Sequence, residues 1–262
     1  MQEKKEKTEK IFQNAFFQKG VWMVLSFLIL AVVWILAAAV VGNGYLLPSL
    51  GETLKETFAL LGRISFWTAF FATLFRALTA FLISFVLAAG LSVVAYTVGG
   101  FEKIFSPILS FLRSLPTMVV LLMILLWTSA SKAPIFVACL VLFPMLYSAM
   151  TSSLAAVDKD LIEMSKAYEV PKKRMIFSLY IPSVLPTVCR ESATSLSFSL
   201  KLIVSAEVMS NTFESLGGQM QSASLYAQTP TLFALVLTVF LAGYALECLG
   251  LLLINYIERR LG

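Results

Sequence analysis

The chain has 262 residues, of which 59% are hydrophobic and 13% charged, and its mean hydropathy is +0.86. Length alone would fit one or two soluble domains, but the apolar runs are long enough to cross a bilayer, which excludes that class. The formal net charge of +5 and the pI near 9.1 do not indicate nucleic-acid binding, because the basic residues gather on one side of the apolar runs.

The residue types that carry most enzyme chemistry are missing or lie in apolar surroundings. The sequence contains no histidine, which removes imidazole ligands and the commonest general base. Its three cysteines, Cys139, Cys189 and Cys248, lie inside apolar runs and are interpreted as small buried residues. No GxxxxGK(S/T) or HExxH motif occurs. We therefore expect no enzyme activity, cofactor or metal, and any ATPase that drives this chain would be another polypeptide.

The chain begins with a charged segment, residues 1–20, that we expect to be a cytoplasmic tail. Its part at residues 11–17 is weakly amphipathic, which fits either an interfacial helix on the inner membrane surface or a frayed tail. The uncharged run Val21–Val41 is long enough for a first span. The span and the outer turn that follows it comprise residues 21–48. This run is too long for a signal peptide, and no small-residue cleavage site follows it.

The remaining core, residues 49–260, is predicted to contain five more spans. It opens on an amphipathic segment at residues 49–66. The spans are expected at about residues 68–98, 113–127, 133–157, 183–209 and 230–257. Gly99 and Gly100 make a short turn before the 113–127 span. Pro144 lies inside the next span, where it either produces a simple kink or bends the helix to shape a passage.

A polar segment at residues 158–182 separates two of these spans but does not resemble an ordinary loop. Asp160 and Glu163 have capping-box spacing, which predicts the start of a helix. Its apolar stripe comprises Leu161, Met164, Ala167 and Tyr168. Pro171 suits the first turn of a second helix, and Pro182 marks the return to the membrane. Two short amphipathic helices outside the bilayer need a surface to cover their apolar faces, and a soluble partner would supply it.

The same segment resembles the coupling-loop signature of ABC importer permeases, the binding-protein-dependent inner-membrane subunits. That signature is Glu-Ala-Ala, three residues, Gly, nine residues, then Ile-x-Leu-Pro. Glu163, Met164 and Ser165 stand at Glu-Ala-Ala, Glu169 at the Gly, and Leu179, Ile181 and Pro182 at Ile-x-Leu-Pro. The spacing matches better than the identities do. Since the Gly normally permits the turn between the two helices, Glu169 must make that turn by another route.

Other stretches resemble the taurine, sulfonate and nitrate type of these permeases. The amphipathic segment at residues 49–66 and the Phe-Arg-Ala-Leu run around Arg76 both occur in that type. Members also show Trp-Lys, five residues, then Glu; here Lys201 and Glu207 fit, while Leu200 replaces the Trp. The resemblance covers about residues 50–260 and implies a small, often anionic solute.

The resemblance implies an all-α membrane protein with six transmembrane helices and an amphipathic cytoplasmic coupling-helix loop. It implies a dimer with a second permease copy or a homologous permease, ATP-binding cassette ATPase subunits and an extracytoplasmic solute-binding protein, within the lipid bilayer and without nucleic acid. It assigns the ATPase contact to Glu163, Met164, Ser165, Tyr168, Glu169, Pro171 and Pro182. Residues 211–229 resemble the short re-entrant or surface segment found there in the family.

The distribution of basic residues gives the orientation independently of the motif. Six spans place both termini on one side of the membrane. Fourteen basic residues fall on that side: Lys4, Lys5, Lys7, Lys10, Lys19, Lys103, Arg113, Lys159, Lys166, Lys172, Lys173, Arg174, Arg259 and Arg260. Only Lys55, Arg63 and Lys132 fall on the other. This bias predicts an inner-membrane, multi-pass protein with both termini and the 158–182 loop in the cytoplasm.

Four ionisable residues within the apolar runs, Arg76, Lys201, Glu207 and Glu247, are candidates for lining the pathway. Such groups cost about 2.5–3.5 kcal/mol to insert, so they usually face a protein interior or an aqueous cavity. Lys201 and Glu207 are six residues apart and point about 120° away from each other on an ideal helix, so we do not expect them to pair. They either line or gate the pathway, or pair with neighbouring spans to fix packing.

Two other functions compete with the importer subunit. An ion-coupled secondary transporter would use Lys201 and Glu207 to bind its driving ion, and would show inverted repeats with broken helices at matching positions. No such repeat is visible in the sequence. A non-transporting membrane scaffold would leave the intramembrane charges unexplained.

Overall fold

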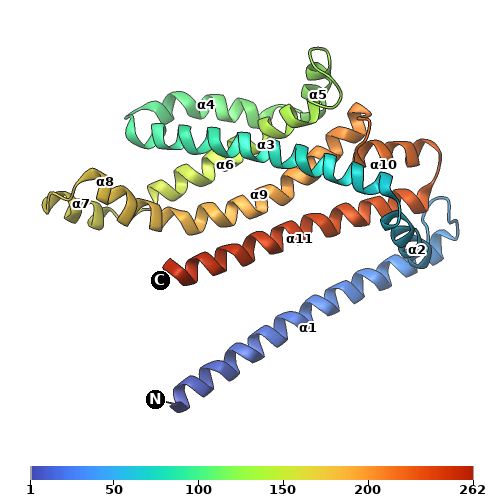
Figure 1. Ribbon diagram of the computed structural model, residues 1–262, viewed down its shortest axis with the longest axis horizontal. Helices are drawn as coiled ribbons and strands as arrows, with labels where there is room; N and C mark the ends of the chain where they lie inside the picture. The colour runs from blue at the N-terminus through green and yellow to red at the C-terminus, as the bar shows by residue number, and fades with distance from the viewer. Residues whose placement is uncertain (1, 262) are drawn as a thin grey trace.

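The computed structural model describes the backbone of residues 2–261 and the side chains of residues 21–254 except Met23 and Leu253. This described part is helical almost throughout and contains no strand, so the all-α prediction is confirmed. The helices lie side by side as an elongated bundle (Figure 1). The prediction about the apolar side chains at residues 11–17 falls outside the described side chains, although the backbone there belongs to helix α1 (Gln2–Val41).

Several helices have the length and apolar composition needed to cross a membrane. Within the described residues there are four such helices, or five if one bent pair counts as a single span. They are α1, α3 (Ile64–Thr97), α6 (Ala133–Ala155), α11 (Thr229–Leu261) and the bent pair α4 (Phe101–Ser114) with α5 (Thr117–Leu125). Many large apolar side chains of α1, α3 and α11 are exposed on the outside of the bundle, as a lipid environment requires, whereas half of α6 is buried.

Helix α9 (Ile181–Ser210) lies inside the bundle and contacts α3, α5, α6, α10 (Leu216–Leu225) and α11. Its 30 residues would extend about 45 Å, longer than the hydrocarbon core of about 30 Å. Small residues allow α11 to approach it closely. A Cβ atom at Gly250 of α11 would lie 2.5 Å from the Cβ of Ala193, so only glycine fits at this crossing.

The segment predicted as a third span from residue 113 has a different shape. Helix α4 begins directly after Gly100, which adopts a left-handed φ of 90°. The axis then turns by 87° between α4 and α5, so the prediction of a span opening at Arg113 is wrong. Pro116 explains the turn, because it has no N–H to donate and forces Leu115 into an extended conformation. Alone, the nine residues of α5 would extend only about 14 Å.

The polar segment forms helix α7 (Lys159–Ala167), followed by the single turn α8 (Lys172–Met175). The prediction that Asp160 caps this helix is wrong. The cap is Asp158, two residues earlier, whose carboxylate accepts the N–H of Asp160 at 2.9 Å. Asp160 instead lies in the first turn, where its charge favours the positive end of the helix dipole.

Glu169 makes the turn after α7 in the conformation that glycine would adopt. Its φ is 51°, in the left-handed region. The N–H of Val170 donates to the carbonyl of Ser165 at 2.9 Å, and that of Glu169 to Lys166 at 3.0 Å, which together form a Schellman motif. The glutamate therefore adopts a left-handed conformation, at a backbone cost of about 1–2 kcal/mol that glycine would avoid.

At Pro182, the residue predicted to mark the return to the membrane, the helix is continuous: it runs from α8 through a π-helical turn, η1 (Ile176–Tyr180), into α9. The N–H of Ile181 donates to the carbonyl of Ile176, the wider spacing of a π turn. Pro182 and Pro186 have no N–H to donate, so the first turns of α9 cannot complete a regular α-helical ladder. The extra residue in the turn accommodates this loss without ending the helix.

The helices alternate in direction along the bundle (Figure 1). The N-terminal end of α1 and the C-terminal end of α11 lie at the end of the bundle that carries α7 and α8. Helices α2 (Leu50–Leu61) and α10 lie at the opposite end. Helix α2 begins with a complete capping box, in which Ser49 and Glu52 each accept the other's backbone N–H.

Candidate functional site

A buried ion pair joins α3, α9 and α10 near the end of the bundle opposite α7. The carboxylate of Glu207, on α9, has no exposed surface and lies 2.8 Å from the guanidinium of Arg76, on α3, whose side chain is 14% exposed. Thr73 donates its hydroxyl to the same carboxylate at 2.9 Å, and the backbone N–H of Gly217 donates at 3.2 Å. Three donors from α3 and α10 thus converge on one anion of α9, which offsets the cost of burying it.

Glycines at the start of α10 make this arrangement possible. A Cβ atom on Gly217 would lie 2.7 Å from the carbonyl oxygen of Val204, too close for any other residue. The hydroxyl of Ser215 caps α10 by accepting the N–H of Gly218 at 2.8 Å. The N–H of Leu216 donates to the Thr73 hydroxyl at 3.0 Å. The N-terminal turn of α10 is therefore fixed against α3 and α9 by backbone contacts.

The structure brings together only two of the four predicted pathway residues, Arg76 and Glu207. Lys201 points to another side of α9, is exposed, and its Cε would lie 3.6 Å from a Cβ atom on Gly243 of α11. Among the side chains that the structure describes, Lys201 makes no ion pair. Glu247 is half-buried on α11 and outside the Arg76–Glu207 pair. The expectation that Lys201 and Glu207 do not pair is in agreement with this geometry.

A polar stripe runs along the exposed side of α9, and we call it the α9 stripe. It comprises Ser183, Thr187, Arg190, Thr194, Lys201 and Ser205, all of them exposed in the single chain. The intervals of four, three, four, seven and four residues keep these side chains on one face of the helix. Sequence reasoning considered only the charges in this span, but the period of its hydroxyl residues was a signal that could have revealed the stripe.

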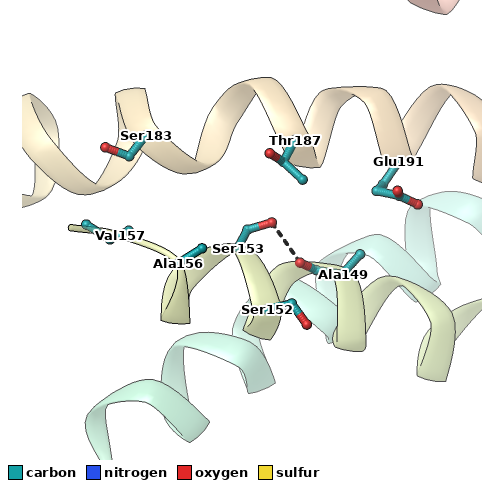
Figure 2. A pocket seen from close by; sticks show the side chains of 8 residues that line it. All are labelled: Ala149, Ser152, Ser153, Ala156, Val157, Ser183, Thr187 and Glu191. Atoms are coloured by element: carbon teal, nitrogen blue, oxygen red, sulfur yellow. Dashed lines mark hydrogen bonds between the residues drawn. The ribbon is translucent and has the colours of Figure 1, made fainter. Parts of the chain in front are cut away.

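The α9 stripe continues into a groove of about 310 Å³ at the end of the bundle near α7. Figure 2 shows the lining, with Ser183, Thr187 and Glu191 on α9 facing Ser152 and Ser153 at the end of α6. The remaining lining residues are Ala149, Ala156 and Val157. Ser153 donates to the carbonyl of Ala149 at 2.8 Å, which leaves its oxygen free to accept a hydrogen bond. The groove therefore presents polar side chains from both helices beside the apolar part of its lining.

The apolar stripe of α7 is uncovered. Tyr168 is 79% exposed, Met164 52% and Leu161 41%, and no residue of α7 is buried. Helix α7 projects from the end of the bundle (Figure 1). Ser165 donates to the carbonyl of Leu161 at 2.7 Å, so its hydroxyl faces its own helix. The remaining predicted contact residues, Glu163, Glu169, Pro171 and Pro182, are likewise exposed. The predicted contact residues thus lie on an uncovered surface of the single chain.

These features define a class before any comparison: a multi-pass helical membrane protein with charged groups inside its spans and an exposed helix with an apolar stripe at one end of the bundle. Residues 100–262 match the family described as binding-protein-dependent transport system inner membrane component. Because the match covers more than half of the chain, the chain belongs to this family of ABC transporter permeases.

Curated relatives agree with this assignment. A probable ABC transporter permease protein of Brucella melitensis is 24% identical over 219 residues, which are 79% of this chain and 87% of the relative. The putative aliphatic sulfonates transport permease protein SsuC of Bacillus subtilis is 25% identical over 62% of this chain and 60% of its own length. ProW of Escherichia coli, a glycine betaine/proline betaine transport permease, is 25% identical over 57% of this chain and 42% of its own length.

Solved structures share the fold. The MetNI methionine ABC transporter in an inward-facing conformation aligns with a TM-score of 0.61 at 17% identity, covering 73% of this chain and 96% of that one. A bacterial ABC transporter involved in the import of the acidic polysaccharide alginate aligns with a TM-score of 0.63 at 14% identity, covering 91% and 96%.

Family membership decides between the functions that the sequence left open. The chain is the permease subunit of an ABC import system in the inner membrane, a transport subunit and not an enzyme. An ion-coupled secondary transporter and a non-transporting scaffold are thereby set aside. The family also implies ATPase subunits, a binding protein and a paired permease as partners.

Proposed function

We propose that the chain forms one half of a solute pathway lined by the α9 stripe, facing the same stripe of a second permease. The observation that carries the proposal is the exposure of this stripe along α9, a helix of 30 residues that we propose as one of the spans. Exposing a helix face with Arg190 and Lys201 to lipid would be unfavourable. Each basic side chain near the centre of the bilayer costs about 2.5–3.5 kcal/mol. An aqueous passage between two subunits removes that cost. The groove of about 310 Å³ between α6 and α9 is then the cytoplasmic mouth of the passage.

The chemistry of the stripe favours a small anionic solute. Its two ionisable members are both basic, and the one acid near its cytoplasmic end, Glu191, lies in the groove. Basic side chains along a pore favour anions, and the hydroxyls of Ser183, Thr194 and Ser205, which donate to carbonyls of their own helix here, can turn to donate hydrogen bonds to an anionic solute. A sulfonate, nitrate or carboxylate group would suit this lining. The relative named for aliphatic sulfonates supports the taurine, sulfonate and nitrate type.

Lys201→Met is expected to lower ATP-driven uptake about tenfold, because it removes a positive charge from the pathway and replaces it with a chain of similar length. Expression, assembly and basal ATPase activity should stay near normal, since no described carboxylate depends on Lys201. Uptake by proteoliposomes and ATPase activity are measured on the same preparation.

The matched control is Lys132→Met, which removes one positive charge outside the α9 stripe. Full uptake by the Lys201→Met variant would remove this residue from the pathway. Poor expression or loss of the complex would instead assign Lys201 to packing.

We assign the Arg76–Glu207 pair to structure: it holds α10 against α3 and α9 at the extracytoplasmic end. Both groups are withdrawn from the exposed side of the bundle: the Arg76 guanidinium donates to the Glu207 carboxylate, which also accepts hydrogen bonds from Thr73 and from the backbone of α10. Glu247 remains a candidate for the pathway wall or for packing between spans.

The contact with the ATPase is proposed to be the apolar stripe of α7. Met164 and Tyr168 would enter a groove on the ATPase subunit, and the Schellman turn at Glu169 would set the angle at which α7 leaves the bundle. One such loop on each permease serves one ATPase of a pair. The external binding protein would deliver the solute at the opposite end, where α2 and α10 lie.

The proposed topology has six spans with both termini in the cytoplasm. The alternating helix directions and the shared location of both ends with α7 support an even number of crossings (Figure 1). Single cysteines in a background without the three native ones test it. Labels at Ser131 and Ser222 should react with an impermeant reagent from outside, whereas labels at Lys7 and Lys173 should not. Outside reactivity at Lys173 would overturn the topology.

A further inference from the structure

An apolar groove of about 640 Å³ opens on the side of the bundle, close to the α7–α8 end. It lies between the second half of α3, the end of α6 and the α8–η1–α9 segment. Phe85, Met150 and Val188 belong to its apolar lining, while Tyr96, Lys172 and Tyr180 give it polar groups at one end. Neither the solute pathway nor the contact with the ATPase uses this groove.

The dimensions of the groove match one leaflet of a bilayer. Its lining on α3 extends from Phe85 to Thr97, twelve residues apart, which correspond to about 18 Å along a helix. The hydrocarbon part of one leaflet is about half of 30 Å. An apolar groove of this length that follows a membrane-spanning helix has the shape to hold an acyl chain.

The polar end of the groove lies where lipid headgroups would be. The hydroxyls of Tyr96 and Tyr180 are 3.0 Å apart and exposed, and tyrosine collects at the boundary between membrane and water. Lys172 belongs to the lining, and it is followed along the chain by Lys173 and Arg174, which are exposed. Basic residues at this depth attract anionic headgroups by about 1 kcal/mol each.

We propose that this groove binds one anionic phospholipid, with an acyl chain along α3 and α9 and the phosphate at Lys172 and the tyrosine pair. Charge complementarity favours this occupant over a second copy of the chain, because two copies would bring their own lysines together at the same place. The bound lipid would contact α8 and η1, the segment that joins the ATPase-coupling helix to the pathway helix. The proposal depends on the membrane placement of the chain and not on the identity of its solute.

The test counts lipids retained by the detergent-purified permease–ATPase complex in native mass spectrometry, after addition of phosphatidylglycerol or phosphatidylcholine. Lys172→Gln should lower phosphatidylglycerol retention about tenfold, because a charge-assisted contact with the phosphate is lost. Lys173→Gln, which removes the same charge from a neighbour outside the lining, should retain the lipid. Val184→Trp, which places a large ring in the apolar part of the groove, should lower retention of both lipids.

Three results would overturn the proposal. Equal losses in the Lys172→Gln and Lys173→Gln variants would mean attraction by surface charge without a site. Retention unchanged by Val184→Trp would mean that no acyl chain lies in the groove. A disulfide formed between copies of a Val93→Cys variant in the membrane would identify a second copy of the chain as the occupant, which also contradicts the proposal.

Discussion

Replacing Met164 with aspartate is expected to abolish ATP-driven uptake while the permease stays folded in the membrane. Met164 is 52% exposed, and no other part of the described chain covers it, so the substitution leaves the bundle intact. In the assembled transporter, the same side chain would be buried in a groove of the ATPase subunit. An unpaired carboxylate there costs several kcal/mol, which is enough to separate ATP hydrolysis from transport.

The matched control is Lys166→Asp, which places the same carboxylate on another side of α7. Uptake in proteoliposomes and copurification of the ATPase subunit are measured for both variants. The Met164 variant should lose uptake, with weakened copurification, whereas the Lys166 variant should keep most of both. Normal assembly and transport with aspartate at position 164 would show that the apolar stripe of α7 is not the coupling surface.

The architecture was accessible from sequence because its signals are local. Long apolar runs predict helices of spanning length, and the polar segment at residues 158–182 carries its helical period within one short stretch. Glu169 is an instructive case. The spacing placed it at the position of a glycine, and the structure shows that it adopts the glycine conformation, with a φ of 51°. Position in the motif was therefore a better guide to backbone geometry than residue type.

The features that sequence reasoning missed depend on longer-range or competing effects. The 87° turn before α5 follows from Pro116. From the sequence alone, however, the run from Arg113 to Pro116 also fits the opening of a straight span. The π turn at residues 176–180 lies just before Pro182, which from the sequence indicates only the return of the chain to the membrane. The Arg76–Glu207 pair joins residues 131 positions apart. No local pattern assigns a partner to either charge.

Arg76→Met is expected to destabilise the permease by about 3–5 kcal/mol, because it leaves the fully buried Glu207 without its countercharge. The expected result is poor expression and a lower midpoint of thermal unfolding for the detergent-solubilised complex. Adding Glu207→Gln to this variant should restore most of the loss. A neutral amide needs no cation, and its oxygen can still accept the hydrogen bonds donated by Gly217 and Thr73.

The single variant Glu207→Gln separates the structural assignment from a role in the pathway. If the pair only fixes α10 against α3 and α9, the Glu207→Gln protein should assemble and transport solute at a near-normal rate, and the double variant should do the same. If the carboxylate itself gates the solute, uptake should fall in both proteins although the complex remains assembled. Thermal unfolding, ATPase copurification and uptake on the three variants form a double-mutant cycle, and its coupling energy measures the interaction between the two charges directly.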